Sequence, residues 1–121
     1  METWVSGADG TGFGIEHLPL GVLRAGSEPP RPAVRIGDRG LLLAPLAAAG
    51  LLDAAEGARA EALREVLQAP SLNPLLELGR PSWSGLRTRL TELLAAGNSE
   101  LADAGLSGAL VPLDEAEALL P

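Results

Sequence analysis

The stretch FGIEHLPLGVLR at residues 13–24, followed by RPAVRIGDRGLLL at residues 31–43, decides which fold this sequence is expected to adopt. In the first stretch, Pro19 favours extended or turning backbone for the residue before it, and residues 20–23 predict a short strand. Gly21 lies inside that strand, where glycine marks a bulge or a close approach of backbone. The stretch therefore predicts an extended entry into a sheet.

The second stretch predicts a β-hairpin. Residues 33–36 place valine and isoleucine on one face and arginine on the other, which is the period of a strand. Residues 37–40 read Gly-Asp-Arg-Gly, which is typical of a turn, and the leucines of residues 41–43 supply the return strand. One helical turn at residues 46–49, ended by Gly50, is expected after the hairpin.

The second half of the chain has a helical period. Residues 54–68 place apolar side chains at helical spacing and charged side chains mostly on the other face, and Pro70 ends this helix. Asn73 before Pro74 predicts an N-cap followed by proline at the first helical position. The short helix that they start is expected to stop at Gly79.

The clearest helix in the sequence is expected to begin with Ser82 as its N-cap and to end at residues 97–98, which read Gly-Asn. Its apolar stripe contains Trp83, Leu86, Leu90, Leu93 and Leu94. Its outward face contains Arg87, Arg89 and Glu92. We expect the stripe to form part of the core.

The tail, residues 101–121, predicts a short strand at Leu110 and Val111 and then an acidic turn. A chain of 121 residues is long enough to bury one modest core. Strands followed by helices indicate the α+β class. We therefore expect one α+β domain over residues 1–112 and a connector over residues 113–121.

Composition excludes several classes of protein. The formal net charge is −7, all nine basic residues are arginine, and the aromatics are two tryptophans and one phenylalanine. Such a chain repels phosphate backbones and offers no base-stacking platform, so we expect no nucleic-acid partner. The chain has no cysteine, which excludes disulfides and fits a cytoplasmic protein. The longest uncharged apolar run, residues 41–52, is interrupted by Pro45 and Gly50, so we expect no membrane partner.

The sequence offers few groups for catalysis. Glycine recurs through residues 6–14, but no strand precedes this loop, no helix follows it and the phosphate-binding lysine is missing, so a surface loop is favoured. His17 is the only histidine, and on extended backbone its neighbour Glu16 points the other way, which favours a structural or surface role. Ser84 stands in no Gly-x-Ser-x-Gly motif.

Two further groups of side chains are better explained by structural or surface roles than by a binding site. Asp114, Glu115 and Glu117 form the tightest acidic cluster, and a solvated helix N-terminus explains them better than a cation site. Trp4 and Trp83 are expected to anchor the core, since two aromatics without a third make a poor ligand cage. We therefore expect no catalytic, cofactor-binding or metal-binding residue on this chain.

Residues 13–23 resemble the opening of the N-terminal domain of the fumarylacetoacetase family, whose pattern is Phe-Pro-Ile-x-Asn-Leu-Pro-Phe-Gly-Val-Phe. Residues 31–43 resemble that domain's Arg-Pro, Val-x-Ile-Gly-Asp and Leu-Asp-Leu segments. The matching residues of the helical half are Leu72-Asn73, Leu76 to Gly79, Trp83, Leu86-Arg87 and Leu90 to Leu94. The tail at residues 110–113, Leu-Val-Pro-Leu, is similar to the lead-in to the family's catalytic domain.

The sequence departs from the family pattern at four positions in its first segment. Gly14 replaces proline, His17 replaces asparagine, and Leu20 and Leu23 replace aromatic residues. Smaller side chains at the last two positions imply looser packing of the first strand or a different interface. The resemblance implies a small SH3-like β-barrel with accompanying helices.

The resemblance also implies a function. The family's enzyme cleaves a carbon-carbon bond of 4-fumarylacetoacetate to give fumarate and acetoacetate in tyrosine catabolism, using magnesium or calcium and a His-Glu pair that activates water. Those residues belong to a catalytic domain that would follow residue 121, so none is expected here. The implied partners are that C-terminal catalytic domain and, in the full-length enzyme, a second copy in a homodimer. The alternative is a free-standing protein-interaction module with an SH3-like barrel.

Overall fold

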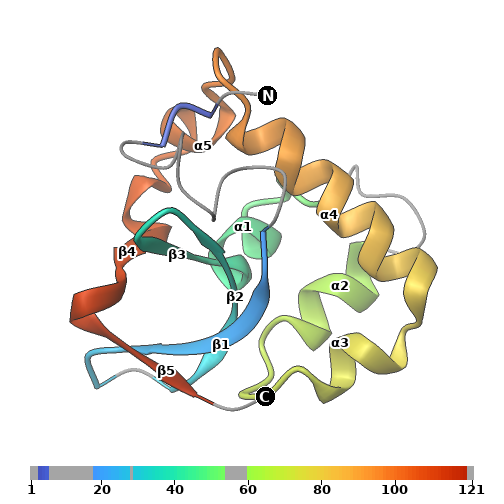
Figure 1. Cartoon of the computed structure of the whole chain (residues 1–121). Helices are drawn as coiled ribbons and strands as arrows, with labels where there is room; N and C mark the ends of the chain where they lie inside the picture. Colours follow the sequence, from blue (N-terminus) through green and yellow to red (C-terminus); the bar gives the residue numbers. More distant parts are fainter. Residues whose placement is uncertain (1–2, 6–17, 28, 54–59, 120–121) are drawn as a thin grey trace.

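Figure 1 shows strands on one side of the molecule and helices packed beside them on the other. The structure is a computed structural model, and it describes residues 3–5, 18–27, 29–53 and 60–119. Antiparallel strands and separate helices make the fold α+β, as the sequence predicts.

The sheet has five antiparallel strands in the order β4-β3-β2-β1-β5. These are β1 (Leu20–Ala25), β2 (Arg31–Ile36), β3 (Arg39–Leu42), β4 (Leu110–Pro112) and β5 (Ala116–Leu119). The expected hairpin is confirmed, because β2 and β3 pair with Val34 opposite Leu41. Its turn is shorter than predicted, since Gly37 at φ 63° and Asp38 alone connect the strands.

The helices are α1 (Leu43–Ala48), α2 (Ala60–Val66), α3 (Asn73–Glu77), α4 (Arg80–Leu94) and α5 (Glu100–Asp103). The helix expected over residues 54–68 is confirmed in its second part as α2, and residues 54–59 lie outside the described residues. Within the part of the chain that the structure describes, no helix has the length and apolar character needed to cross a bilayer.

Both predicted N-caps are wrong, because each of the two residues lies inside its helix. Asn73 is the first residue of α3, and Leu72 takes the capping position without a side-chain hydrogen bond. Ser82 lies inside α4, where its Oγ donates to the Leu78 carbonyl at 3.3 Å, and Gly79 precedes the helix with φ 93°. The N–H groups of the first helical turn have no acceptor within the helix, so proline, which has no N–H, is tolerated anywhere in that turn. Each helix can therefore begin one residue before its proline.

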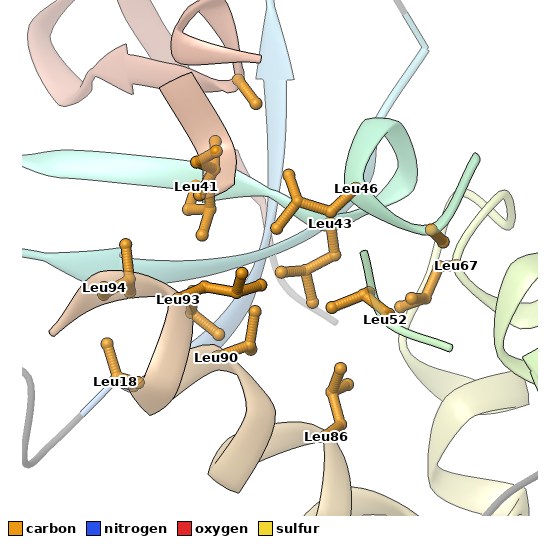
Figure 2. Packing of buried hydrophobic residues seen from close by; sticks show 14 of the residues in the cluster. Leu18, Leu41, Leu43, Leu46, Leu52, Leu67, Leu86, Leu90, Leu93 and Leu94 are labelled. Atoms are coloured by element: carbon orange, nitrogen blue, oxygen red, sulfur yellow. The ribbon is translucent and has the colours of Figure 1, made fainter. Parts of the chain in front are cut away.

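The core joins the long helix α4 to one face of the sheet. Figure 2 shows leucines of α4 directed towards Leu41 and Leu43. The predicted stripe is confirmed: its four leucines, Leu86, Leu90, Leu93 and Leu94, are fully buried, and Trp83 is half-buried against them. From the sheet, Val34, Ile36 and Leu41 enter the same cluster. Burial of this apolar area provides the main stabilisation of the fold.

Residues 3–5 close the C-terminal end of α4. The Trp4 indole Nε1 donates to the Leu93 carbonyl at 2.8 Å, and the Trp4 backbone N–H and the Thr3 hydroxyl donate to the Leu94 carbonyl. The last carbonyls of a helix have no partner within the helix, so these bonds satisfy groups that the helix leaves open. Val5 is buried in the core beside them.

The tail is more ordered than the sequence suggests. Residues 107–109 form the 3-10 turn η1 and residues 113–115 the 3-10 turn η2, on either side of β4. β4 is confirmed, but β5, which falls in the expected connector, pairs with β1 and belongs to the sheet. Among the described residues no ladder joins the edge strands β4 and β5, so the sheet is open and a closed barrel is not confirmed.

Candidate functional site

The N-terminal site candidates lie outside the described residues. His17, Glu16 and the glycine loop of residues 6–14 all fall there. The expectation that they carry no chemistry therefore stays a prediction. Ser84 is described, and it lies on the exposed side of α4, where its carbonyl accepts a hydrogen bond from the Thr88 hydroxyl at 3.1 Å.

The acidic cluster borders a polar hollow at one edge of the sheet. Asp114 and Glu115 are exposed on η2, and with Arg24 and Ser27 they line a hollow of about 440 Å³. Their turn is three residues long, shorter than the helix N-terminus that the sequence predicts. Glu117 is part of β5. In the described residues, no three acidic, histidine or cysteine side chains gather closely enough to hold a metal ion.

Both tryptophans act as anchors at the rim of the core, as predicted. Trp4 and Trp83 are half-buried against the leucine cluster, one from the N-terminal segment and one from α4. The guanidinium carbon of Arg87 lies 5.8 Å from the centroid of the Trp83 ring, within range of a cation–π contact. Packing of both rings against the leucine cluster anchors α4, and the contact of Arg87 with Trp83 lies within that helix.

Arg89 has a structural role that the sequence does not reveal. It was expected to face away from the core, yet its side chain is only 11% exposed. Its Nε donates to the Leu51 carbonyl at 2.8 Å, and its Nη2 donates to Glu100 Oε1 at 2.9 Å. The aliphatic stem of arginine can be buried while its head reaches polar partners. Arg89 thereby ties α4 to α5 and to the segment after α1.

The pKa of the Glu100 carboxyl is lowered by its neighbours. The hydrogen bonds from Arg89, and then the bond from the Asn98 amide at 2.9 Å, lower the pKa of this carboxyl below its ordinary value. Both partners stabilise the charged form. Because this carboxylate serves an ion pair on the surface, we assign it to stability and not to catalysis.

A second face of the sheet, away from the leucine core, offers a binding surface, which we call the Leu23 face. By register it consists of Gly21, Leu23, Ala33, Gly40 and Leu42, and Arg31 and Arg35 lie on the same side. Leu23, Ala33 and Gly40 are buried, and Gly21 and Leu42 are partly exposed. The strand register places them together, since Ala33 lies opposite both Gly21 and Leu42. Side chains alternate along a strand, so Leu23 and Gly40 project to the same side.

Two hollows open on the Leu23 face, and Leu23 lines both. The larger, of about 380 Å³, extends over Leu42 to α1, and the smaller, of about 200 Å³, extends over Gly21 to Leu113. The described residues that line them include arginine and glutamine but no carboxylate, histidine or hydroxyl group. The lining is mainly apolar apart from Arg31, Arg35 and Gln68, so the hollows suit groups that are mostly apolar.

At Gly40, side chains from β1 and η2 lie against β3. A Cβ atom at Gly40 would overlap the end of the Leu23 side chain and would lie 3.5 Å from Cδ2 of Leu113. In a flat sheet β1 and β3 would be about 10 Å apart, which a leucine side chain hardly spans. The sheet is therefore strongly curved towards the Leu23 face. The sequence could not reveal this contact, because it joins residues that are far apart in the chain.

Known proteins match the sequence of this chain over nearly its whole length. The model of the family described as "Fumarylacetoacetase N-terminal" matches residues 16–121. The fumarylacetoacetase of Oryza sativa subsp. japonica is 39% identical over an alignment of 127 residues that covers 100% of this chain. The fumarylacetoacetases of Arabidopsis thaliana and Caenorhabditis elegans are each 34% identical, over 85% and 100% of this chain.

The relatives are several times longer than this chain. The alignments span 29% of the rice protein, 24% of the Arabidopsis protein and 28% of the nematode protein. More than two-thirds of each relative therefore lies outside the matched region. The family model covers most of this chain and bears the name of an N-terminal region. The chain belongs to the fumarylacetoacetase N-terminal family.

Proposed function

We propose that this chain is the non-catalytic N-terminal structural domain of a fumarylacetoacetase-like hydrolase. The observation that carries the proposal is the family match over residues 16–121 together with the 24–29% of each relative that the chain spans. The composition and the exposed, scattered acidic groups support it, because they leave little material for an acid-base pair.

The full-length protein would then cleave the carbon-carbon bond of 4-fumarylacetoacetate, giving fumarate and acetoacetate in tyrosine catabolism. The magnesium or calcium ion of that reaction does not fit the described residues, which provide no cluster of three metal-ligating side chains. We therefore place the metal ligands and the His-Glu pair on the C-terminal catalytic domain and derive no catalytic step on this chain.

We also propose that the sheet forms an SH3-like barrel. The edge strands β4 and β5 are consecutive in the chain, and only residues 113–115 separate them. Across a flat five-stranded sheet the two edges would be about 19 Å apart. The four Cα steps from Pro112 to Ala116 reach about 15 Å at most. A curled sheet resolves this difference, and the contact of Leu23 with Gly40 supports it.

The setting that we propose is the cytoplasm, and the assembly is a homodimer of the full-length enzyme. The absence of cysteine agrees with a reducing compartment. Size-exclusion chromatography with light scattering on the full-length protein measures the assembly directly, and a monomer across micromolar concentrations would contradict the homodimer.

The proposal is tested by assaying the purified chain with 4-fumarylacetoacetate in the presence of magnesium or calcium. We expect no turnover above the uncatalysed rate, measured as loss of the diketone's ultraviolet absorbance. The protein extended through the complete reading frame is the matched positive control. Turnover by the isolated chain that a chelator abolishes would overturn the assignment as a non-catalytic domain.

The alternative, a free-standing interaction module, gains support from one observation, the apolar hollows of the Leu23 face. The two functions differ in what the gene encodes after residue 121. A continuation that supplies carboxylates and a His-Glu pair supports the hydrolase, and a stop codon supports the free-standing module.

A further inference from the structure

We infer that the Leu23 face is the docking surface for the C-terminal remainder of the longer polypeptide, with an apolar side chain of that remainder seated beside Gly21. This inference rests on the proposed function and deepens it, since it names which surface of this chain makes the interdomain contact. Two observations carry it: the shape of the face, and the share of the relatives that lies outside the match.

The two faces of the sheet differ in what covers them. Leucines of α4 cover the face that carries Val34, Ile36 and Leu41, and those residues belong to the buried core. On the Leu23 face, Leu23 and Ala33 are buried by the chain itself, and hollows of about 380 and 200 Å³ with a mainly apolar lining open beside them, over Leu42 and over Gly21. Binding sites are concave and mostly apolar with a few polar groups, which is the form of these hollows.

Gly21 provides the space for an incoming group. A Cβ atom built at Gly21 meets nothing within 4 Å, whereas one at Gly40 on the same face would overlap Leu23. Gly21 lies in β1 with ordinary strand backbone, so its lack of a side chain is not required by a positive φ. Because Gly21 also lines the smaller hollow beside Leu23 and Ala33, the room beside it suits a side chain from outside this chain.

The remainder of the polypeptide is the occupant that the comparisons favour. More than two-thirds of each relative lies outside the matched region, which is ample to provide an interdomain surface of about 600–1,500 Å². β5, the last described strand, pairs with β1, so the chain leaves the sheet next to the strand that carries Gly21 and Leu23. A short path thus leads from the end of β5 to the Leu23 face.

The test uses thiol protection, because the chain has no cysteine of its own. Gly21→Cys places one thiol in the smaller hollow, and Gly108→Cys is the matched control, since a Cβ there also meets nothing within 4 Å. Each variant is made in the isolated chain and in the complete reading frame. Maleimide labelling at the two positions is followed by peptide mass spectrometry, which separates them from any cysteine of the remainder.

We expect labelling at position 21 to be at least 10-fold slower in the complete protein than in the isolated chain, and labelling at position 108 to change less than 2-fold. Equal labelling at position 21 in both would overturn the inference. So would protection that rises with the concentration of the isolated chain, because that result identifies a second copy as the occupant. The proposed function is tested separately: it is wrong if the complete wild-type protein does not turn over 4-fumarylacetoacetate.

A second variant covers the case in which the isolated chain does not fold. Gly21→Leu in the complete protein would clash with the seated side chain, so we expect its melting temperature to fall by several degrees, with Gly108→Leu unchanged. A Gly21→Leu protein as stable as wild type would show an unoccupied hollow and would overturn the inference without reference to the isolated chain.

Discussion

The two faces of the sheet use leucine in opposite ways. Towards α4, leucines from helix and strand interlock, and residues such as Leu90 and Leu41 are completely buried. On the Leu23 face, Leu23 is also buried, at 7% exposed, but it lies against Gly40 and borders two open hollows. Packing on the α4 side stabilises the fold, and the hollows of the Leu23 face leave room for another surface. The predictions below test this division.

The largest effect is expected from Leu90→Ala, on the buried face. Leu90 is fully buried in the stripe of α4, and removing its side chain loses transfer energy and leaves a cavity. We expect the free energy of unfolding to fall by about 2 to 5 kcal/mol, measured by urea denaturation. Leu76→Ala, at a leucine that is 54% exposed, is the control and should cost less than about 0.5 kcal/mol.

Gly79→Ala tests whether the turn before α4 fixes the orientation of this helix against the buried face of the sheet. Gly79 has φ 93° and ψ 169°, a conformation that only glycine adopts readily, and it separates α3 from α4. We expect a loss of about 1 to 3 kcal/mol in the free energy of unfolding, from backbone strain. Gly108→Ala, at a glycine without positive φ, is the control. Equal stability of the two variants would show that the start of α4 shifts freely and that the stripe is not fixed by this turn.

Leu23→Ala makes the same change as Leu90→Ala on the other face. The hollows already open beside Leu23, so little new cavity forms, and we expect a cost of about 1 to 2 kcal/mol in the isolated chain. Adding Gly40→Ala should restore part of the loss, because its Cβ occupies the space that Leu23 filled. A cost as large as that of Leu90→Ala would show a second packed core and would remove the contrast between the faces.

The elements that the sequence predicts well are those held by local spacing. The stripe of α4 follows a helical period over consecutive turns, and the hairpin of β2 and β3 alternates with period two around a glycine turn. In both, the residues that identify the element are its own. The predicted first residues of α3 and α4 were wrong because proline and asparagine are compatible with several neighbouring positions in the first turn.

The features that sequence reasoning missed depend on distant partners. The sequence predicts a connector at β5 because its four residues have no strong strand pattern, and their partners on β1 lie 91 to 97 residues earlier, as in Val22 opposite Leu119. The Leu23 face is visible only after the register places Gly21, Ala33 and Leu42 together. Arg89 is similar, because its acceptor at Leu51 is 38 residues away. No local signal marks such pairs.

The smallest effect is expected at the polar rim, from Glu100→Gln. Arg89 lowers the pKa of Glu100 below its ordinary value of 4.5, so the folded state favours the charged carboxylate. Its contribution is present above that ordinary value and is lost as the pH falls through the lower folded pKa. We therefore expect wild type to exceed Glu100→Gln slightly in melting temperature at pH 7, and the two to converge as the pH falls through the lowered folded pKa. Glu77→Gln, which removes the same charge from α3, corrects for net charge. A difference that stays constant as Glu100 titrates would assign the effect to geometry instead of charge, and the ion pair would then add nothing to the stability that the leucine core provides.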